Sequence, residues 1–558
     1  MKMMNLIKYI LFTLPLTLYA QDWGPQVEVL IPRDNIYQLD QASLIKNIDT
    51  GRRIALFYPV SVSDLLIPYG PMKTFFESDP DDPVRKLIYD LTRTVSPFKS
   101  MDEVFKWLGV HEYPSIIQEE NPNPLPLLSA QEKSLPMGAT LIQTKDGEAL
   151  TFGCAACHAS DLFGVKILGL TNRFPRANEF FRQGQSFAPY INSFIFKDLL
   201  KTTEGERLML LKAKTSTKWV GTKKPKMIGL DTSLAQVALS LAKREKDPYA
   251  TRTELSAKLP RPNKLSKLVA DSKPAVWWNV KYKNRWLSDG SIISGNPVHT
   301  NFLWNEIGRG TDLKKLEEWM KTATPQIEAL TTAVFATKAP RFEKFFGPDS
   351  ISLESARRGQ KHFVQSCQKC HGIYEKGWDL PDAKQLSNIE LIQNIKITYH
   401  KKTPVINVGT DPGRYLGMYE FAADLNRLQI SKNLKTIVEP QKGYVPPPLE
   451  GIWARWPYFH NNSIPNLCAL LTKSADRPKT FTTGAAINKK TDFDLNCVGY
   501  PLGEKAPTAW SKNPDYLYDT KKQGLTNTGH DIGIIIKDGK EIFTDEEKKD
   551  LIEFLKTL

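Results

Sequence analysis

No heptad and no short repeat runs through this chain of 558 residues, and its glycine (33) and proline (38) counts are ordinary. Coiled-coil, collagen-like and low-complexity proteins are therefore excluded. A mean hydropathy of −0.36 argues against a polytopic membrane protein. At roughly 150 residues per domain, a chain of this length predicts two to four domains and ample material for a buried core.

Long apolar runs are also lacking, except at the start of the chain. Lys2 and Lys8 provide a basic region, residues 9–19 are mostly apolar, and Ala20 offers a small residue for cleavage. Spanning a bilayer takes about 20 apolar residues, so this stretch is too short. We expect residues 1–20 to be a signal peptide, no membrane span after its cleavage, and a periplasmic or secreted protein. The alternative is an uncleaved N-terminal anchor.

Positive charge is present without a dense basic run. The chain holds 75 Lys and Arg against 61 Asp and Glu, a net charge of +14, but its lysines stand singly or in pairs. An exported protein rarely meets nucleic acid, so we expect no nucleic-acid partner. A solvated surface is the simpler interpretation, and docking of a small acidic redox partner protein is the alternative. Walker A and H-E-x-x-H sequences are absent.

Cysteine is scarce, and its placement defines the chemistry. Four of the six cysteines lie in two copies of C-x-x-C-H, Cys154 to His158 and Cys367 to His371. Two thiols at this spacing add to the two vinyl groups of one haem, and the adjacent histidine reaches the iron. A zinc site or a thioredoxin-like pair would not require a histidine after both pairs. The sequence predicts two covalently bound haem c groups, attached through Cys154, Cys157, Cys367 and Cys370 and ligated by His158 and His371.

The two remaining cysteines, Cys468 and Cys497, lie in the C-terminal half. In an oxidising compartment we expect them to form a disulfide, with two buried free thiols as the alternative.

The sequence that follows the first haem motif resembles the sequence that follows the second. In each half, an aromatic cluster is followed by a turn rich in Asp or Asn. The first half has Trp277-Trp278 and then residues 286–292; the second half has residues 453–456 and then residues 458–464. An amphipathic helix then closes each half, over residues 311–321 and 544–558, with a threonine as the expected N-cap. A similar short loop precedes each helix, at residues 305–308 and 530–533. These matches predict a duplication.

One difference between the halves is informative. A cytochrome c fold takes its sixth iron ligand from the loop before the C-terminal helix. That loop offers His530 in the second half, whereas the first half has Asn305, and an amide is a poor haem ligand. One closed and one open haem would make a catalytic site fed by an electron-transfer site. The alternative is that His299 ligates the first iron.

With these motifs, the chain resembles the di-haem c-type family that contains bacterial cytochrome c peroxidases and rubber oxygenase A with its relatives. The matching text includes residues 154–180, 277–291, 447–471 and 527–530. The resemblance implies an N-terminal haem that binds dioxygen or peroxide, and a C-terminal haem ligated by His371 and His530 that handles electrons. It makes Trp277, Trp278 and Ile293 the nearest candidates for the distal lining of the first haem.

His460 lies in the second aromatic turn, opposite Ser288 of the first. We expect it to be a hydrogen-bonding residue of the haem pocket, with a core histidine or an iron ligand as alternatives. The sequence leaves open whether Ca²⁺ bridges the domains.

The expected fold is mainly α, with two cytochrome c-like haem domains (residues 136–340 and 350–558), long loops, and an N-terminal extension over residues 21–135. The candidate site residues near the open iron are Trp277, Trp278, His299 and Asn305. Three functions follow: an oxygenase or oxidase acting on an apolar organic substrate, a hydrogen peroxide reductase, and a non-catalytic di-haem electron carrier.

Overall fold

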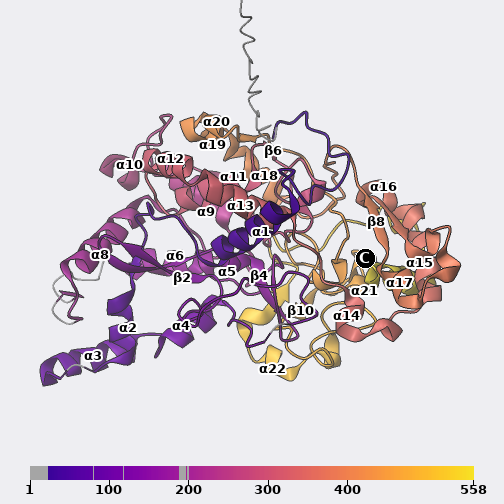
Figure 1. The fold of residues 1–558 in the computed structure, drawn as a ribbon, viewed down its shortest axis with the longest axis horizontal. Coiled ribbons are helices and arrows are strands. Elements are labelled where there is room, and N and C mark those ends of the chain that lie inside the picture. Colours follow the sequence, from indigo (N-terminus) through magenta and orange to yellow (C-terminus); the bar gives the residue numbers. More distant parts are fainter. Residues whose placement is uncertain (1–22, 80, 117, 188–195, 198–199) are drawn as a thin grey trace, which may run out of the picture.

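The computed structural model describes residues 23–79, 81–116, 118–187, 196–197 and 200–558 (Figure 1), so the predicted signal peptide lies outside the described residues. These residues form a mainly α-helical protein with long loops and short strands, as the sequence predicted. Within the described ranges, no helix combines the length and the apolar character needed to cross a bilayer.

The first half is built on a crossing of two helices. α1 (Gln41–Leu56) packs most extensively against α13 (Thr324–Phe335), with α9 (Ser233–Ala242) and α11 (Pro297–Gly308) beside them. Gly51 makes the close crossing possible, because a Cβ atom there would lie 2.1 Å from the carbonyl oxygen of Ala329. α1 belongs to the segment predicted as an N-terminal extension, and its packing makes it part of the first core.

The second half repeats this crossing with α15 (Leu353–Ser366) and α23 (Asp545–Lys556). Here Gly359 lies at the contact, where a Cβ atom would fall 1.9 Å from the carbonyl oxygen of Asp550. α23 begins with the predicted cap: Thr544 accepts from the backbone N–H of Glu547, whose side chain accepts in return.

The corresponding helix of the first half differs from the prediction. α12 (Leu313–Thr322) is capped by Asp312, because the hydroxyl of Thr311 instead donates to the buried carboxylate of Glu306. The helix that crosses α1 is α13, one element later. The prediction of Thr311 as N-cap is therefore wrong.

Strands are short and pair in small antiparallel sheets. The only sheet of three strands among the described residues has the order β1-β3-β2 and precedes the first haem motif. The strands are β1 (Ile67–Pro68), β2 (Ala139–Thr144), β3 (Gly147–Phe152), β4 (Ala159–Leu162), β5 (Val165–Leu168), β6 (Ile292–Ser294), β7 (Ile373–Lys376), β8 (Ile395–Thr398), β9 (Ile437–Val438), β10 (Thr480–Thr482), β11 (Leu517–Asp519), β12 (Ile536–Lys537) and β13 (Lys540–Glu541).

Shorter or peripheral helices complete the fold. They are α2 (Tyr69–Glu77), α3 (Pro83–Val95), α4 (Met101–Leu108), α6 (Ala177–Phe187), α8 (Glu204–Ser216), α10 (Glu254–Lys258), α14 (Phe342–Phe346), α17 (Asn388–Gln393), α18 (Gly413–Tyr419), α19 (Ala422–Arg427), α20 (Gln429–Asn433), α21 (Leu467–Leu470) and α22 (Thr508–Ser511).

The two halves interlock. α18 to α20 belong to the second half of the sequence, yet they pack against α9 and α12 of the first half (Figure 1), and β9 pairs with β6. Met418, Phe421, Leu425 and Leu428 are buried in the same core as α11 and α13. The domain division at residues 340–350 stays a prediction, and packing crosses it here.

The predicted duplication is visible in the backbone of the two aromatic turns. Trp286 pairs with Ile292 across the first turn, and Tyr458 pairs with Ile464 across the second. The residue after each aromatic has a positive φ, +70° at Leu287 and +64° at Phe459. The two turns therefore have the same length and the same left-handed residue after the aromatic side chain, as the sequence repeat predicted.

Candidate haem-binding cavity

Both C-x-x-C-H motifs open onto one cavity. Its volume is about 520 Å³, and its lining is mostly apolar. Cys154, Cys157 and His158 line one part, and Cys367, Cys370 and His371 line another. A mostly apolar cavity with a few polar groups is the usual form of a cofactor site.

Each motif forms a single helical turn, α5 (Ala155–His158) and α16 (Gln368–His371). The Nδ1 atom of His158 lies 2.9 Å from the carbonyl oxygen of Ala275, and that of His371 lies 2.8 Å from the carbonyl oxygen of Pro447. A carbonyl only accepts, so each Nδ1 carries the proton and each Nε2 is free to bind a metal. Burial lowers the pKa of both histidines to about 4, which keeps both rings neutral, as metal ligation requires.

The cavity brings His530 opposite His371. The two ring centroids are 6.5 Å apart. Two metal–nitrogen bonds of about 2 Å, together with half of each ring, span a distance of this size. The residues present therefore fit one iron between these two histidines, which is the ligand pair that the resemblance implied.

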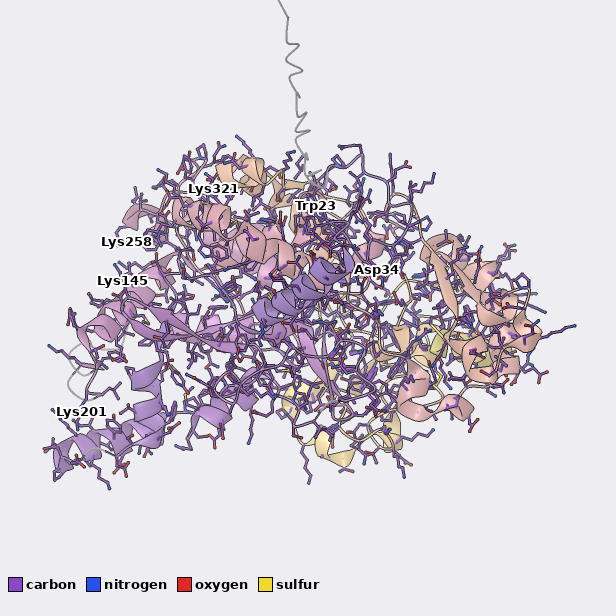
Figure 2. The ribbon with its side chains drawn as sticks, in the orientation of Figure 1. Trp23, Asp34, Lys145, Lys201, Lys258 and Lys321 are labelled. Atoms are coloured by element: carbon purple, nitrogen blue, oxygen red, sulfur yellow. A yellow bond between two sulfur atoms is a disulfide. The ribbon has the colours of Figure 1, made fainter. Side chains whose placement is uncertain are left out.

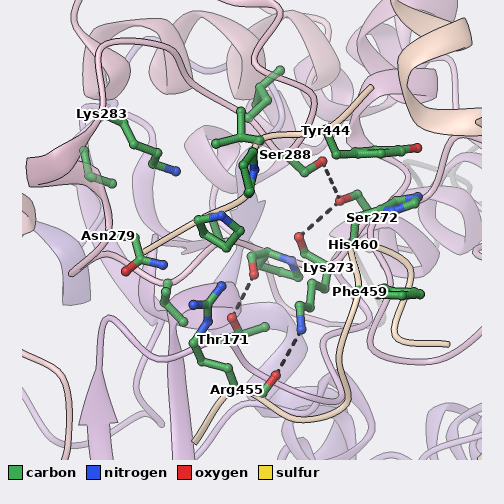
Figure 3. Close-up of a pocket in the computed structure, with 18 of the residues that line it drawn as sticks. Thr171, Ser272, Lys273, Asn279, Lys283, Ser288, Tyr444, Arg455, Phe459 and His460 are labelled. Atoms are coloured by element: carbon green, nitrogen blue, oxygen red, sulfur yellow. Dashed lines mark hydrogen bonds between the residues drawn. The ribbon is translucent and has the colours of Figure 1, made fainter. Parts of the chain in front are cut away.

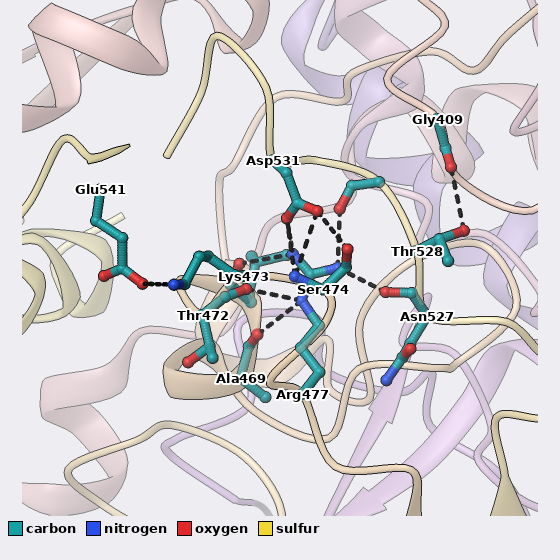
Figure 4. A network of polar contacts seen from close by, with 12 residues as sticks. Gly409, Ala469, Thr472, Lys473, Ser474, Arg477, Asn527, Thr528, Asp531 and Glu541 are labelled. Carbon is teal, nitrogen blue, oxygen red and sulfur yellow. Dashed lines mark hydrogen bonds and ion pairs between the residues drawn. The ribbon is translucent and has the colours of Figure 1, made fainter. Parts of the chain in front are cut away.

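The loop that carries His530 is held by a buried arginine (Figure 4). The Arg477 side chain has no exposed surface and donates to the carbonyl oxygens of Asn527 and Gly529 and to the Asp531 carboxylate. Sequence reasoning missed Arg477, and no sequence signal marks it.

Among the described residues, the ring that contacts His158 is that of a tryptophan and not of a second histidine. The ring of Trp277 lies 5.6 Å from that of His158, on the side of the motif histidine, so Trp277 does not fit the expected distal role. Trp278 is fully buried in the second hydrophobic core, where its indole donates to the carbonyl oxygen of Glu450. Among the described residues, neither Trp278 nor Ile293 lines the cavity.

α11 contributes six residues to the cavity wall: Pro297, Val298, Thr300, Asn301, Trp304 and Asn305. Asn305 thus lies on a helix, and the predicted loop at this position is wrong, because the helix continues to Gly308. His299 is absent from the described cavity lining. Its buried Nδ1 has no hydrogen-bond partner among the described residues.

His460 lines the cavity, and its expected role as a hydrogen-bonding residue of the haem pocket stays a prediction. Its ring stacks on Tyr444 at 4.0 Å, and burial lowers its pKa to about 3. Tyr444 was not identified from the sequence.

Cationic side chains also line the cavity (Figure 3). Lys273, Lys283, Arg414 and Arg455 all contribute to its wall. Lys273 donates to the carbonyl oxygens of Arg455 and Pro457, and burial lowers the pKa of Lys283 to about 8. Buried cations need anionic partners, and the two carboxylates of a haem would supply them. Lys283 and Arg455 each lie three residues before the aromatic residue that begins the turn of their half, Trp286 and Tyr458. The sequence could therefore have identified this pair of cations.

The remaining cysteines form the expected disulfide, Cys468–Cys497, with a Cα–Cα distance of 5.0 Å. The four free cysteines are those of the two motifs. No group of three or more His, Cys, Asp or Glu side chains in the described part of the chain could hold a metal ion, and bridging Ca²⁺ stays an open prediction.

Comparison with known proteins connects the cavity to cytochromes. A family described as RoxA-like, cytochrome c-like matches residues 443–482, a segment that includes Pro447, Arg455 and His460. The chain is 40% identical over 252 residues to "Uncharacterized protein y4iM" of Sinorhizobium fredii, covering 42% of this chain and 55% of that protein. It is 27% identical over 268 residues to "Uncharacterized protein y4iJ" of the same organism, covering 40% and 41%. The chain spans about half the length of these relatives.

Proposed function

We propose that this chain is an exported di-haem c-type oxidoreductase. An N-terminal haem with one open axial position would activate dioxygen or peroxide, and a C-terminal haem held by His371 and His530 would handle electrons. The observation that carries the proposal is the asymmetry of the shared cavity. A second histidine faces His371, whereas α11 contributes Asn301, Trp304 and Asn305, whose amide and indole groups are poor iron ligands.

The chain's residues divide the work of holding the cofactors. A haem c supplies a redox-active iron and, where an axial position is free, a binding site for a small oxidant. The backbone carbonyls of Ala275 and Pro447 orient His158 and His371. Lys283 and Arg455 would neutralise haem carboxylates, and Trp277 shields the His158 ring from water.

The apolar part of the lining, which includes Trp286, Leu287 and Val298, favours a substrate with little charge. An oxygenase or oxidase acting on an apolar organic molecule is therefore the preferred activity. Peroxide reduction would require an acid–base group above the open iron. The net charge of +14 suits a small acidic redox partner protein.

The first test counts the haems and locates each one. Pyridine haemochrome analysis should return two covalent haems per chain. The double variants Cys154→Ala/Cys157→Ala and Cys367→Ala/Cys370→Ala should each lose one. Haem that extracts into acidified acetone would end the c-type assignment.

The second test counts open irons by titrating the reduced protein with carbon monoxide. We expect one ligand per chain in the wild type, two in His530→Ala, and one in His299→Ala. A wild type that binds none would favour the electron carrier, and binding restored by His299→Ala would identify His299 as the first iron's ligand. Turnover with dioxygen and an apolar alkene, compared with anaerobic turnover with hydrogen peroxide and a reduced donor, separates oxygenase from peroxidase.

A further inference from the structure

His530 differs from the two motif histidines in how its ring is oriented. His158 and His371 each bond a backbone carbonyl through Nδ1, whereas the buried Nδ1 of His530 has no hydrogen-bond partner among the described residues. A metal-binding histidine normally relies on such a bond for its orientation. The His530 ring packs edge-on against Phe459, with the ring centroids 6.0 Å apart, so its orientation depends on this packing and on the backbone that carries it.

That backbone has an uncommon conformation. Gly529 and His530 both have positive φ, +83° and +62°, and a side chain other than glycine reaches this region only when its surroundings enforce it. The N–H of His530 donates to the carbonyl oxygen of Val408 at 2.8 Å, and the Thr528 hydroxyl donates to that of Gly409 at 3.2 Å. These contacts fix one side of the loop.

Arg477 fixes the other side. Its Nη1 donates to the carbonyl oxygens of Asn527 at 2.6 Å and Gly529 at 2.8 Å, and its Nη2 lies 3.1 Å from Oδ1 of Asp531. These three acceptors belong to residues just before and just after His530 in the sequence. One rigid guanidinium therefore fixes the backbone on both sides of His530.

The other donors of Arg477 connect this loop to the helix before it. Nε donates to the carbonyl oxygens of Ala469 and Thr472, at 3.1 and 2.9 Å, and Nη2 also donates to that of Leu470, at 3.3 Å. α21, which contains Leu470, lines the cavity beside the second haem motif. Asp531 in turn accepts from the Ser474 backbone and hydroxyl (Figure 4). The cavity wall and the ligand loop therefore share one anchor.

We propose that Arg477 is the positioning residue that holds His530 at bonding distance from the second iron. This inference rests on the proposed function, in which His530 is an axial ligand. Without the guanidinium, the loop keeps the bonds to Val408 and Gly409 on one side and loses those to Arg477 on the other, and His530 leaves the iron more often although both haems stay attached through their cysteines.

The test compares Arg477→Gln, Arg477→Lys and the matched control Arg244→Gln. Arg244 is as deeply buried and also donates to backbone carbonyls, those of Ile307 and Thr311, but it belongs to the first half. The readouts are the low-spin electron paramagnetic resonance signal and carbon monoxide binding to the reduced protein. Losing buried hydrogen bonds from a charged group should raise the population of detached His530 about tenfold or more in Arg477→Gln. Arg477→Lys keeps the charge and should recover part of the low-spin signal, and Arg244→Gln should leave it unchanged.

His530→Ala separates the two proposals. If it adds no carbon monoxide site, His530 is not the ligand and the proposed function fails at this haem. If it adds one while Arg477→Gln matches the wild type, only the role of Arg477 is refuted. If Arg477→Gln yields no folded holoprotein, the same two measurements are made on Asp531→Asn. This variant weakens the ion pair between Arg477 and residue 531 and leaves the guanidinium in place. An unchanged low-spin signal in Asp531→Asn would overturn the proposal.

Discussion

At the residue scale, neutral histidines and cationic side chains line the same cavity. Burial holds His158 and His371 neutral, with pKa values of about 4. Burial also lowers the pKa of Lys283, to about 8, and the positive charge of Arg455 lowers it in the same direction. Both features suit a cofactor that brings its own metal and its own carboxylates.

A charge substitution tests this arrangement. A nearby cation disfavours the ferric haem, which carries one more positive charge than the ferrous form. Lys283→Met should therefore lower the midpoint potential of the first haem by about 40–90 mV, equivalent to roughly 1–2 kcal/mol. Spectroelectrochemical titration measures it. Lys258→Met serves as the control, because this lysine is exposed, lies at the edge of the molecule (Figure 2) and is not part of the cavity lining. Equal potentials in the two variants would show that Lys283 does not face a haem.

At the element scale, each half depends on one helix crossing, and a glycine makes each crossing possible. In both cases the glycine lies on the earlier helix, and a backbone carbonyl of the later helix occupies the space where a Cβ would be. α15 contacts the second haem motif directly, and the end of α1 lies against Gly153, the residue before the first motif. The partner helix α13 and both helices of the second crossing contribute side chains to the cavity wall.

Adding one methyl group at a crossing should be costly. Gly359→Ala should destabilise the protein by about 1–3 kcal/mol, because the new Cβ overlaps the Asp550 carbonyl oxygen and α23 must shift. Gly184→Ala, on α6, where no other part of the described chain comes within 4 Å of the Cβ position, should stabilise by about 0.5–1 kcal/mol through helix propensity alone. Thermal unfolding of the holoprotein measures both. A similar loss in the two variants would argue against the crossing as the cause.

At the scale of the whole molecule, each half of the sequence contributes residues to the hydrophobic core of the other half. Residues 413–438 leave the second half and complete the first core, while Trp278 and Tyr282 of the first half are buried in the second. This exchange brings the two haem motifs to one cavity, although more than 200 residues separate them in the sequence.

The exchange predicts that neither half is independent. A fragment of residues 350–558 would expose the apolar residues of α18 to α20, including Met418, Phe421 and Leu428, that are buried in the intact chain. We expect this fragment to be insoluble or to lack cooperative unfolding, whereas its co-expression with residues 21–349 should restore soluble protein. A soluble, cooperatively folded fragment carrying one haem would contradict the interlocked arrangement.

The sequence by itself determined which chemistry to expect of this protein. The C-x-x-C-H motifs span only five residues each, so their spacing alone predicts the haem attachment sites and their histidines. The sequence also predicted the Thr544 cap and the paired turns, because each depends on residues close together in the chain. It predicted the Cys468–Cys497 disulfide because only these two cysteines remain outside the haem motifs.

Only the tertiary structure decided what surrounds each haem motif. Alignment of the halves placed Asn305 on a loop, but α11 continues through it, because packing beside α9 and α13 stabilises a longer helix than local signals indicate. The family resemblance gave Trp277 and Trp278 one shared role, yet the ring of Trp277 contacts His158 whereas Trp278 is buried in the core of the second half. The anchoring of His530 by Arg477 joins positions about 50 residues apart, and such a contact leaves no local pattern to read.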